Sequence, residues 1–194
     1  MALSASTGFR FRQSLIGLEH TARQRYLLAG SATVKIGDLV RINNAGLLVR
    51  AATGTAVLGV LDGIVDKNGA NAFSDRASGT AGATLTEDDQ IATASDNATL
   101  SSKNLKGEVI VDPAGVSLFY NDADDTLAQT NLLQMFDVAN GNQVTVGGAS
   151  ESNGQVQLMA IDPDGDGDAS KGLFRIHENQ FGNGLDTATA KVVA

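Results

Sequence analysis

The chain of 194 residues contains no cysteine, no tryptophan and only two prolines. Without cysteine there are no disulfides, no thiolate metal sites and no cysteine nucleophile. Aromatic residues make up 5% of the sequence, whereas glycine occurs 22 times, so the core must be built from Val, Ile, Leu and Ala. Such a composition favours many short strands over a few heavy helices.

Membrane and catalytic signatures are also missing. No apolar run approaches the roughly 20 residues that span a bilayer, and residues 1–14 lack the apolar centre of a signal peptide. There is no G-x-S-x-G elbow, P-loop or dinucleotide fingerprint. His20 and His177 lie far apart in the sequence, and nothing near them suggests a partner. We therefore expect a non-enzymatic protein without a cofactor or a membrane partner.

The most informative feature is the stretch from Val34 to Val65, in which short β-branched runs are broken every few residues by glycine. Within it, residues 56–65 are apolar on both faces apart from Asp62, which predicts a central strand that is covered on both sides. Gly59 and Gly63 would then mark bends or the close approach of another backbone.

Further strands are predicted by apolar residues that recur at every second position, a pattern typical of strands with one buried face. These stretches contain Val109 and Val111; Val116, Leu118 and Tyr120; Val144 and Val146; Val156, Leu158 and Ala160; and Ala188, Ala190 and Val192. Four Asn-Gly dipeptides suit tight hairpin turns, and helical signals at Thr86 and Thr126 support only a turn or two each. We predict a mainly β fold, a small antiparallel barrel or one or more sandwiches, with one or two short helices.

Composition divides the chain into three segments. Residues 1–29 are interpreted as an extended N-terminal arm that gains order against a partner. Residues 30–106 are predicted to form a β-barrel-like unit with a long polar loop over 66–106. Residues 107–194 are predicted to form an acidic, hairpin-rich unit, which either stands alone or shares one domain with residues 30–106.

The charge of the chain is unevenly distributed, with a net value of −8. Residues 1–83 carry nine Lys or Arg and five Asp or Glu, giving +4, whereas residues 84–194 carry five and seventeen, giving −12. An acidic segment such as residues 84–194 repels the phosphates of nucleic acid. The basic arm interleaves arginine with aromatic residues, as protein interfaces do. The predicted interface residues are Phe9, Arg10, Phe11, Arg12, Arg23, Arg25 and Tyr26. Equally, the aromatic residues could close the chain's own barrel.

One acidic motif, from Asp162 to Asp168, places a carboxylate at every second position. The spacing matches the first ligands of a calcium loop, with Gly167 at the position of the sharp turn. Leu173 stands where such a loop needs its final carboxylate, so the match is incomplete. We favour the simpler interpretation, a solvated hairpin tip between strands at 155–161 and 171–177.

The stretch from Gly30 to Gly63 resembles the small decoration, or cement, proteins of tailed-bacteriophage heads. The resemblance lies in Val34-Lys35-Ile36-Gly37-Asp38-Leu39-Val40, followed by Gly54 and by Val57-Leu58-Gly59-Val60. In that family the protein binds the outside of the capsid lattice, commonly as a trimer and sometimes as a dimer, and clamps neighbouring capsid subunits against internal DNA pressure.

The resemblance implies that this chain is a structural protein on the capsid exterior of a virion, made in the host cytoplasm. Its partners would be the major capsid protein and further copies of itself, without direct nucleic acid contact. A rival hypothesis is a calcium-dependent carbohydrate-binding or adhesive β-module with calcium at Asp162–Asp168. The lack of tryptophan counts against this rival, because sugars stack on aromatic faces.

Overall fold

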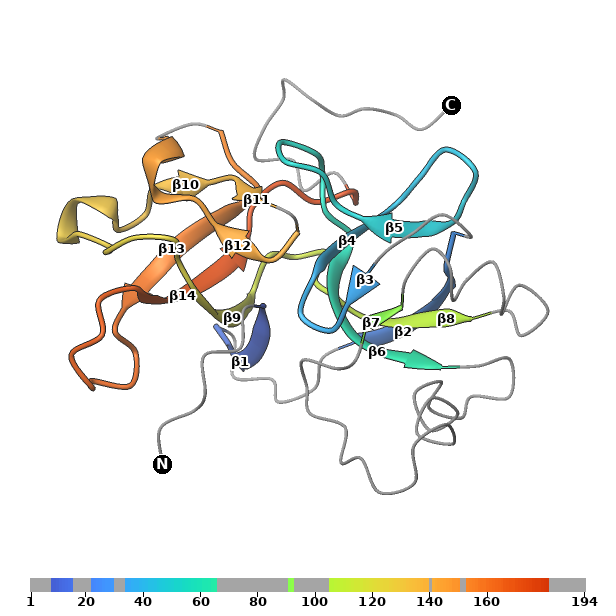
Figure 1. Cartoon of the computed structure of the whole chain (residues 1–194), viewed down its shortest axis with the longest axis horizontal. Helices are drawn as coiled ribbons and strands as arrows, with labels where there is room; N and C mark the ends of the chain where they lie inside the picture. The colour runs from blue at the N-terminus through green and yellow to red at the C-terminus, as the bar shows by residue number, and fades with distance from the viewer. Residues whose placement is uncertain are drawn as a thin grey trace.

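The computed structural model describes residues 8–15, 22–29, 34–65, 91–92, 105–139, 141–150 and 153–181. These residues form two open five-stranded antiparallel sheets and two short ribbons (Figure 1). The predicted mainly β fold is confirmed, and the sheets do not close into a barrel. Helical structure in the described ranges consists of two 3-10 turns, η4 (Gln129–Asn131) and η5 (Val146–Gly148). The turn η4 follows the signal at Thr126, whereas Thr86 lies outside the described residues.

The first sheet has the order β1-β9-β14-β13-β10, and the second has the order β2-β8-β6-β4-β5. The strands of the first sheet are β1 (Arg10–Ser14), β9 (Ser117–Asp122), β14 (Lys171–Ile176), β13 (Val156–Ile161) and β10 (Met135–Phe136). Those of the second are β2 (Ala22–Leu27), β8 (Lys106–Val111), β6 (Gly59–Val65), β4 (Leu39–Ile42) and β5 (Leu48–Arg50). The ribbons pair β3 (Val34–Lys35) with β7 (Ile91–Ala92), and β11 (Val138–Ala139) with β12 (Gln143–Val144).

Two hydrophobic cores lie on opposite faces of the second sheet. Successive residues of its strands alternate between them, with Leu39, Val60 and Ile110 in the first core and Val40, Leu61 and Val109 in the second. The first core also contains Phe119, Leu158 and Phe174, so it packs the two sheets together. The strand β6 lies between β8 and β4 and is buried on both faces. The prediction for residues 56–65 is therefore confirmed.

The three predicted segments are joined by these sheets. The strand β8 begins at the boundary predicted near residue 106, yet it pairs with both β2 and β6. The described part of residues 1–29 is not extended away from the body, because β1 pairs with β9 and β2 pairs with β8. The predicted polar loop, residues 66–106, lies outside the described residues except for β7 and residues 105–106.

Both glycines of β6 have the roles that the sequence predicts. A Cβ on Gly59 would lie 2.1 Å from the carbonyl oxygen of Ile110 and 2.8 Å from Cγ1 of Val109. The backbones of β6 and β8 can therefore approach only because residue 59 has no side chain. Gly63 lies where the register between the two strands shifts after Leu61, so it accompanies an irregularity in the ladder.

We predict that Gly59→Ala destabilises the protein by about 3 kcal/mol or more, because the added methyl group must push β8 out of the ladder. Gly147→Ala is the matched control, since a Cβ there meets nothing within 4 Å. The measurement is chemical denaturation of both variants. Equal stability of the two variants would contradict the close approach of β6 and β8.

Candidate functional site

The seven predicted interface residues belong to two different edges of the structure. Phe9, Arg10, Phe11 and Arg12 lie in or beside β1, the outer strand of the first sheet, whereas Arg23, Arg25 and Tyr26 lie in β2, the outer strand of the second. In the described part of the chain, each of these strands pairs on one side alone. An edge strand presents backbone N–H and C=O groups that a partner can use.

The aromatic residues near β1 pack into the chain's own core. Phe9 is 2% exposed, and its ring meets that of Phe174 edge-on with 6.2 Å between centroids. Phe11 is partly buried and packs in the same way on Phe119, at 6.1 Å. These two rings therefore pack within the chain, although not in a closed barrel, and Phe9 is not an exposed contact residue.

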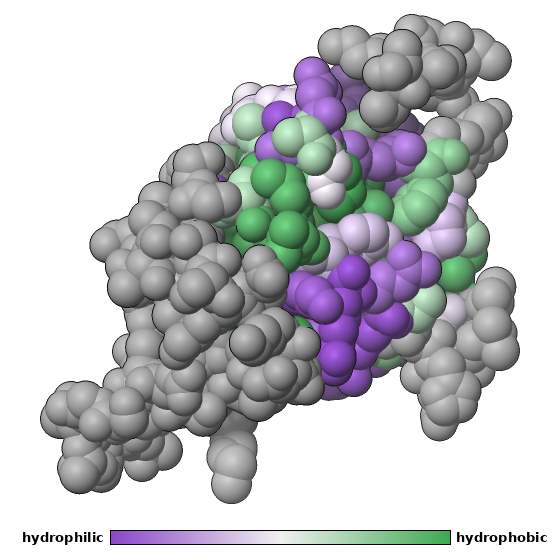
Figure 2. Space-filling model, turned by 90° about the vertical axis from the view of Figure 1, so that its right-hand side faces the viewer, coloured by the Kyte–Doolittle hydropathy of each residue, from purple (hydrophilic) through white to green (hydrophobic). Residues whose placement is uncertain are grey.

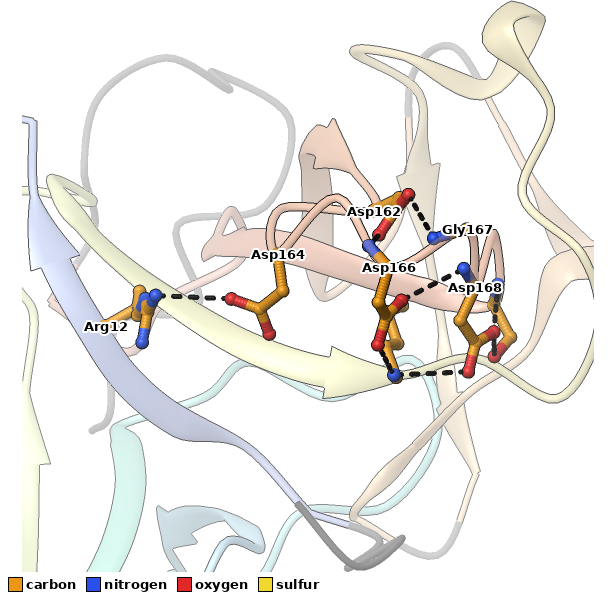
Figure 3. Close-up of polar contacts among 8 residues, drawn as sticks. Arg12, Asp162, Asp164, Asp166, Gly167 and Asp168 are labelled. Atoms are coloured by element: carbon orange, nitrogen blue, oxygen red, sulfur yellow. Dashed lines mark hydrogen bonds and ion pairs between the residues drawn. The ribbon is translucent and has the colours of Figure 1, made fainter. Parts of the chain in front are cut away.

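The arginines of β1 lie near β9 and the acidic turn between β13 and β14. Arg10 lies opposite Tyr120 in the register with β9. The Arg12 side chain is 57% exposed, and its Nη2 lies 3.2 Å from Oδ1 of Asp164, in the turn between β13 and β14 (Figure 3). Arg12 therefore binds an acidic group of its own chain.

The arginines of β2 also form ion pairs and remain accessible. Nε of Arg23 lies 2.7 Å from Oδ2 of Asp62, and Nη2 of Arg25 lies 2.6 Å from Oε1 of Glu108. The arginine side chains are 60% and 52% exposed, respectively. Ion pairs this exposed contribute about 1 kcal/mol or less. A guanidinium has five N–H donors, so one carboxylate partner leaves donors for an incoming acidic group.

The remainder of β2 combines polar and apolar side chains. The Tyr26 hydroxyl donates a hydrogen bond of 2.5 Å to Oε1 of Gln24, and its ring packs against the second core. Burial raises the pKa of Tyr26 above its ordinary value. Leu27, the last residue of the strand, is 40% exposed. On the side of the molecule that carries the second sheet, Figure 2 shows a hydrophilic area beside a hydrophobic one.

The acidic motif forms the predicted hairpin tip between β13 and β14. The Asp162 carboxylate accepts hydrogen bonds from the backbone N–H groups of Asp166 and Gly167, at 3.0 and 2.9 Å (Figure 3). Lys171 lies 2.5 Å from Asp166 and 3.4 Å from Asp168. The hydrogen bond from Lys171 is the main cause that lowers the pKa of Asp166.

The carboxylates of this turn are thus engaged by N–H groups of the chain. Within the described ranges, no group of three or more His, Asp or Glu side chains is arranged to hold a metal ion. The turn has the hydrogen bonds of a self-contained hairpin tip.

Buried polar side chains form a part of the structure that the sequence analysis missed. Gln155 is fully buried; its Oε1 accepts from Val138 N–H, and its Nε2 donates to the carbonyl groups of Ala52 and Thr55. Asn121 is also fully buried and accepts a hydrogen bond from Gly8 N–H. These amides tie loops to the first sheet. Their surroundings come from distant segments, so no local pattern marks them.

The structure describes one of the two histidines. His177 follows β14, with Nδ1 3.3 Å from the carbonyl oxygen of Gly154, and Phe174 and Ile176 before it are buried. His20 lies outside the described residues. In the part of the chain that the structure describes, no helix is long and apolar enough to cross a bilayer.

The fold is that of a β protein with two open antiparallel sheets packed through a shared core, and its candidate contact residues lie on exposed edges. No known protein family and no curated protein matches the chain. Among solved structures, it has a weak similarity to a phage protein, the pre-mature bacteriophage phi29 gene product 12, with a TM-score of 0.37 and 12% identity. The similarity covers 91% of this chain and 23% of that one, so this chain spans less than a quarter of that protein's length.

We predict that the melting temperature stays the same when calcium or EDTA is added, because the Asp162–Asp168 carboxylates already bind N–H groups of the chain. The measurement is differential scanning calorimetry of the intact protein in the two buffers. A rise in melting temperature with calcium that EDTA reverses would restore the calcium-loop interpretation.

Proposed function

We propose that the chain is a non-enzymatic structural protein that binds the outer surface of a bacteriophage capsid and stabilises its lattice. Its partner would be the major capsid protein, and it would act as a homo-oligomer, a trimer or a dimer. The observation that carries the proposal is the strand β2, since five of its six residues are exposed and two of them are arginines. Arginine is enriched at protein interfaces and at their energetic centres.

The support behind β2 suits a lattice clamp. The strand is hydrogen-bonded along its whole length to β8, from Ala22 opposite Val111 to Leu27 opposite Lys106. The strand β8 itself packs into both cores, through Ile110 on one face and Val109 and Val111 on the other, so the exposed edge is held rigidly. A clamp needs no catalyst; it needs many modest contacts that symmetry repeats.

The residues that resemble decoration proteins build this support. Val34 and Lys35 form β3, Leu39 and Val40 begin β4, and residues 57–60 lead into β6. The resemblance therefore concerns the scaffold beneath the edge. Contact residues would differ between proteins that share it, because each capsid surface requires its own side chains.

The balance of basic and acidic residues also favours the second sheet as the part that faces the capsid. Its described ranges, 22–29, 34–65 and 105–112, carry six Lys or Arg and four Asp or Glu. The described residues of 8–15 and 113–181 carry four and nine, respectively. An acidic partner surface would be attracted to the end with β2 and repelled by the end with the acidic turn.

We predict that Arg23→Ala with Arg25→Ala weakens binding to capsids at least about tenfold, because the desolvated arginine contacts of an interface dominate its affinity. Purified protein is mixed with expanded heads of the phage that carries this gene, prepared without this protein, and binding is measured by cosedimentation. Loss of the two surface ion pairs leaves the fold intact, which circular dichroism checks.

Arg50→Ala is the matched control, because Arg50 is an exposed arginine on β5, at the opposite edge of the same sheet. It should bind like the wild type. If the wild-type protein does not sediment with the heads, the proposed function is wrong. If the double variant and the wild type bind equally, β2 is not the contact. Deletion of residues 1–28 is less informative, because it also removes Phe9 from the core.

A further inference from the structure

Asp38 is a buried carboxylate with an unfilled hydrogen-bonding position. The residue is 0% exposed and lies in the turn between β3 and β4. Its Oδ2 accepts a hydrogen bond of 2.8 Å from Lys35 N–H, whereas its Oδ1 is buried without a hydrogen-bond partner. A buried charge with an unsatisfied oxygen is costly. A neutral carboxyl group at the same place costs less.

The turn that holds Asp38 connects the two sheets. Gly37 accepts a hydrogen bond from Phe9 N–H and donates one to the Leu61 carbonyl group, both at 2.8 Å. The Asp38 carbonyl group accepts from Leu61 N–H at 2.9 Å. Gly37 has a φ of +90°, and a Cβ there would lie 3.0 Å from the Cα of Gly8. The chain before β1 is thereby held against β6 through two residues of this turn.

The charges around Asp38 are few. Burial is the main cause that raises its pKa to about 7, while Arg50 of β5 and Lys35 of β3 lower it. Arg41 lies on the adjoining strand β4, and Asp62 on β6 binds Arg23. Gly8 and Phe9 contact Gly37, and Gly141 bonds to Leu39 next to the turn; none of the three has a titratable side chain.

We propose that the Gly37–Asp38 turn is a proton-dependent latch between the two sheets. With a proton on Asp38 the turn stays closed on Phe9 and Leu61. When the proton leaves, the unpartnered oxygen carries charge in a dry site, and the turn opens more often to bring it to water. This inference does not depend on capsid binding, and its failure would leave the proposed function untouched.

Proton binding fixes the direction of the effect. The unfolded chain loses the Asp38 proton near pH 4, whereas the folded chain keeps it to about pH 7. Between these values the folded state holds one more proton, so Asp38 makes stability fall as pH rises through this window. Above about pH 7 both states are ionised and the contribution becomes constant.

Asp112 provides a matched control in the same protein. It is 3% exposed and lies in the turn between β8 and β9, yet both of its oxygens are bonded, Oδ1 by Val116 N–H and Oδ2 by Ser117 N–H. Burial raises the pKa of Asp112 too. Both residues are buried aspartates in turns, and Asp38 has an unpartnered oxygen where Asp112 has a donor for each.

The test is native-state hydrogen exchange of the full chain at about pH 5 and about pH 8, corrected for intrinsic exchange. The protection of the Phe9 and Leu61 amides should fall at least about tenfold at the higher pH. Asp38→Asn should abolish this change, and Asp112→Asn should leave it in place. Equal protection at both pH values in the wild type would overturn the latch, as would an unchanged pH response in Asp38→Asn.

A second measurement needs no variant, in case Asp38→Asn does not fold. The side-chain carboxyl carbon of Asp38 is followed by NMR in the wild-type protein while pH is varied. A midpoint near 7, accompanied by shifts of the Phe9 and Leu61 amides, supports the latch. A midpoint below about 5, near the ordinary value for aspartate, would refute it.

Discussion

The rest of the structure depends on the burial of both faces of the second sheet. Its strands β4, β6 and β8 alternate apolar side chains between two cores, so both of their faces are largely buried. This arrangement requires β6 and β8 to lie close together, which Gly59 permits. It also explains why residues 56–65 are apolar at every position except Asp62. A strand with one wet face would alternate instead.

Burial of both faces restricts where the second sheet can meet a partner. With its faces filled by the chain's own side chains, what it offers is its edges and turns. Here β2 and β1 differ in how firmly they are tied to the core. The segment before β1 inserts Phe9 into the first core and bonds to Gly37. A partner that displaced β1 would therefore also disturb the contact between the two sheets. The strand β2 contributes exposed residues and surface ion pairs, so a partner can engage it without disturbing packing.

Patterns of short range predicted much of this fold. Period-two alternation located β8, β9 and β13, and the Asp-Gly motif gave the hairpin tip with β14 after it, because neighbours in sequence determine strand faces and tight turns. The N-terminal segment was expected to be an extended arm, whereas its described strands β1 and β2 pair with β9 and β8. Arg25 and its partner Glu108 are 83 positions apart, and no local signal specifies pairing at that distance. Phe9 beside arginine suggests an interface in sequence, yet the same residue fills a core in space.

Asp38 illustrates a further limit of sequence reasoning. Its dipeptide with Gly37 belongs to the motif that gave the family resemblance, where aspartate suits a turn after glycine. Only the fold reveals that β6, residues 8–9 and Gly141 enclose this turn and leave one carboxylate oxygen without a donor. Asp112, another buried aspartate in a turn, has a donor for each oxygen. The two carboxylates differ in the backbone N–H groups that the folded chain brings to them. The effect of each aspartate on the pH dependence of stability therefore follows from the tertiary structure.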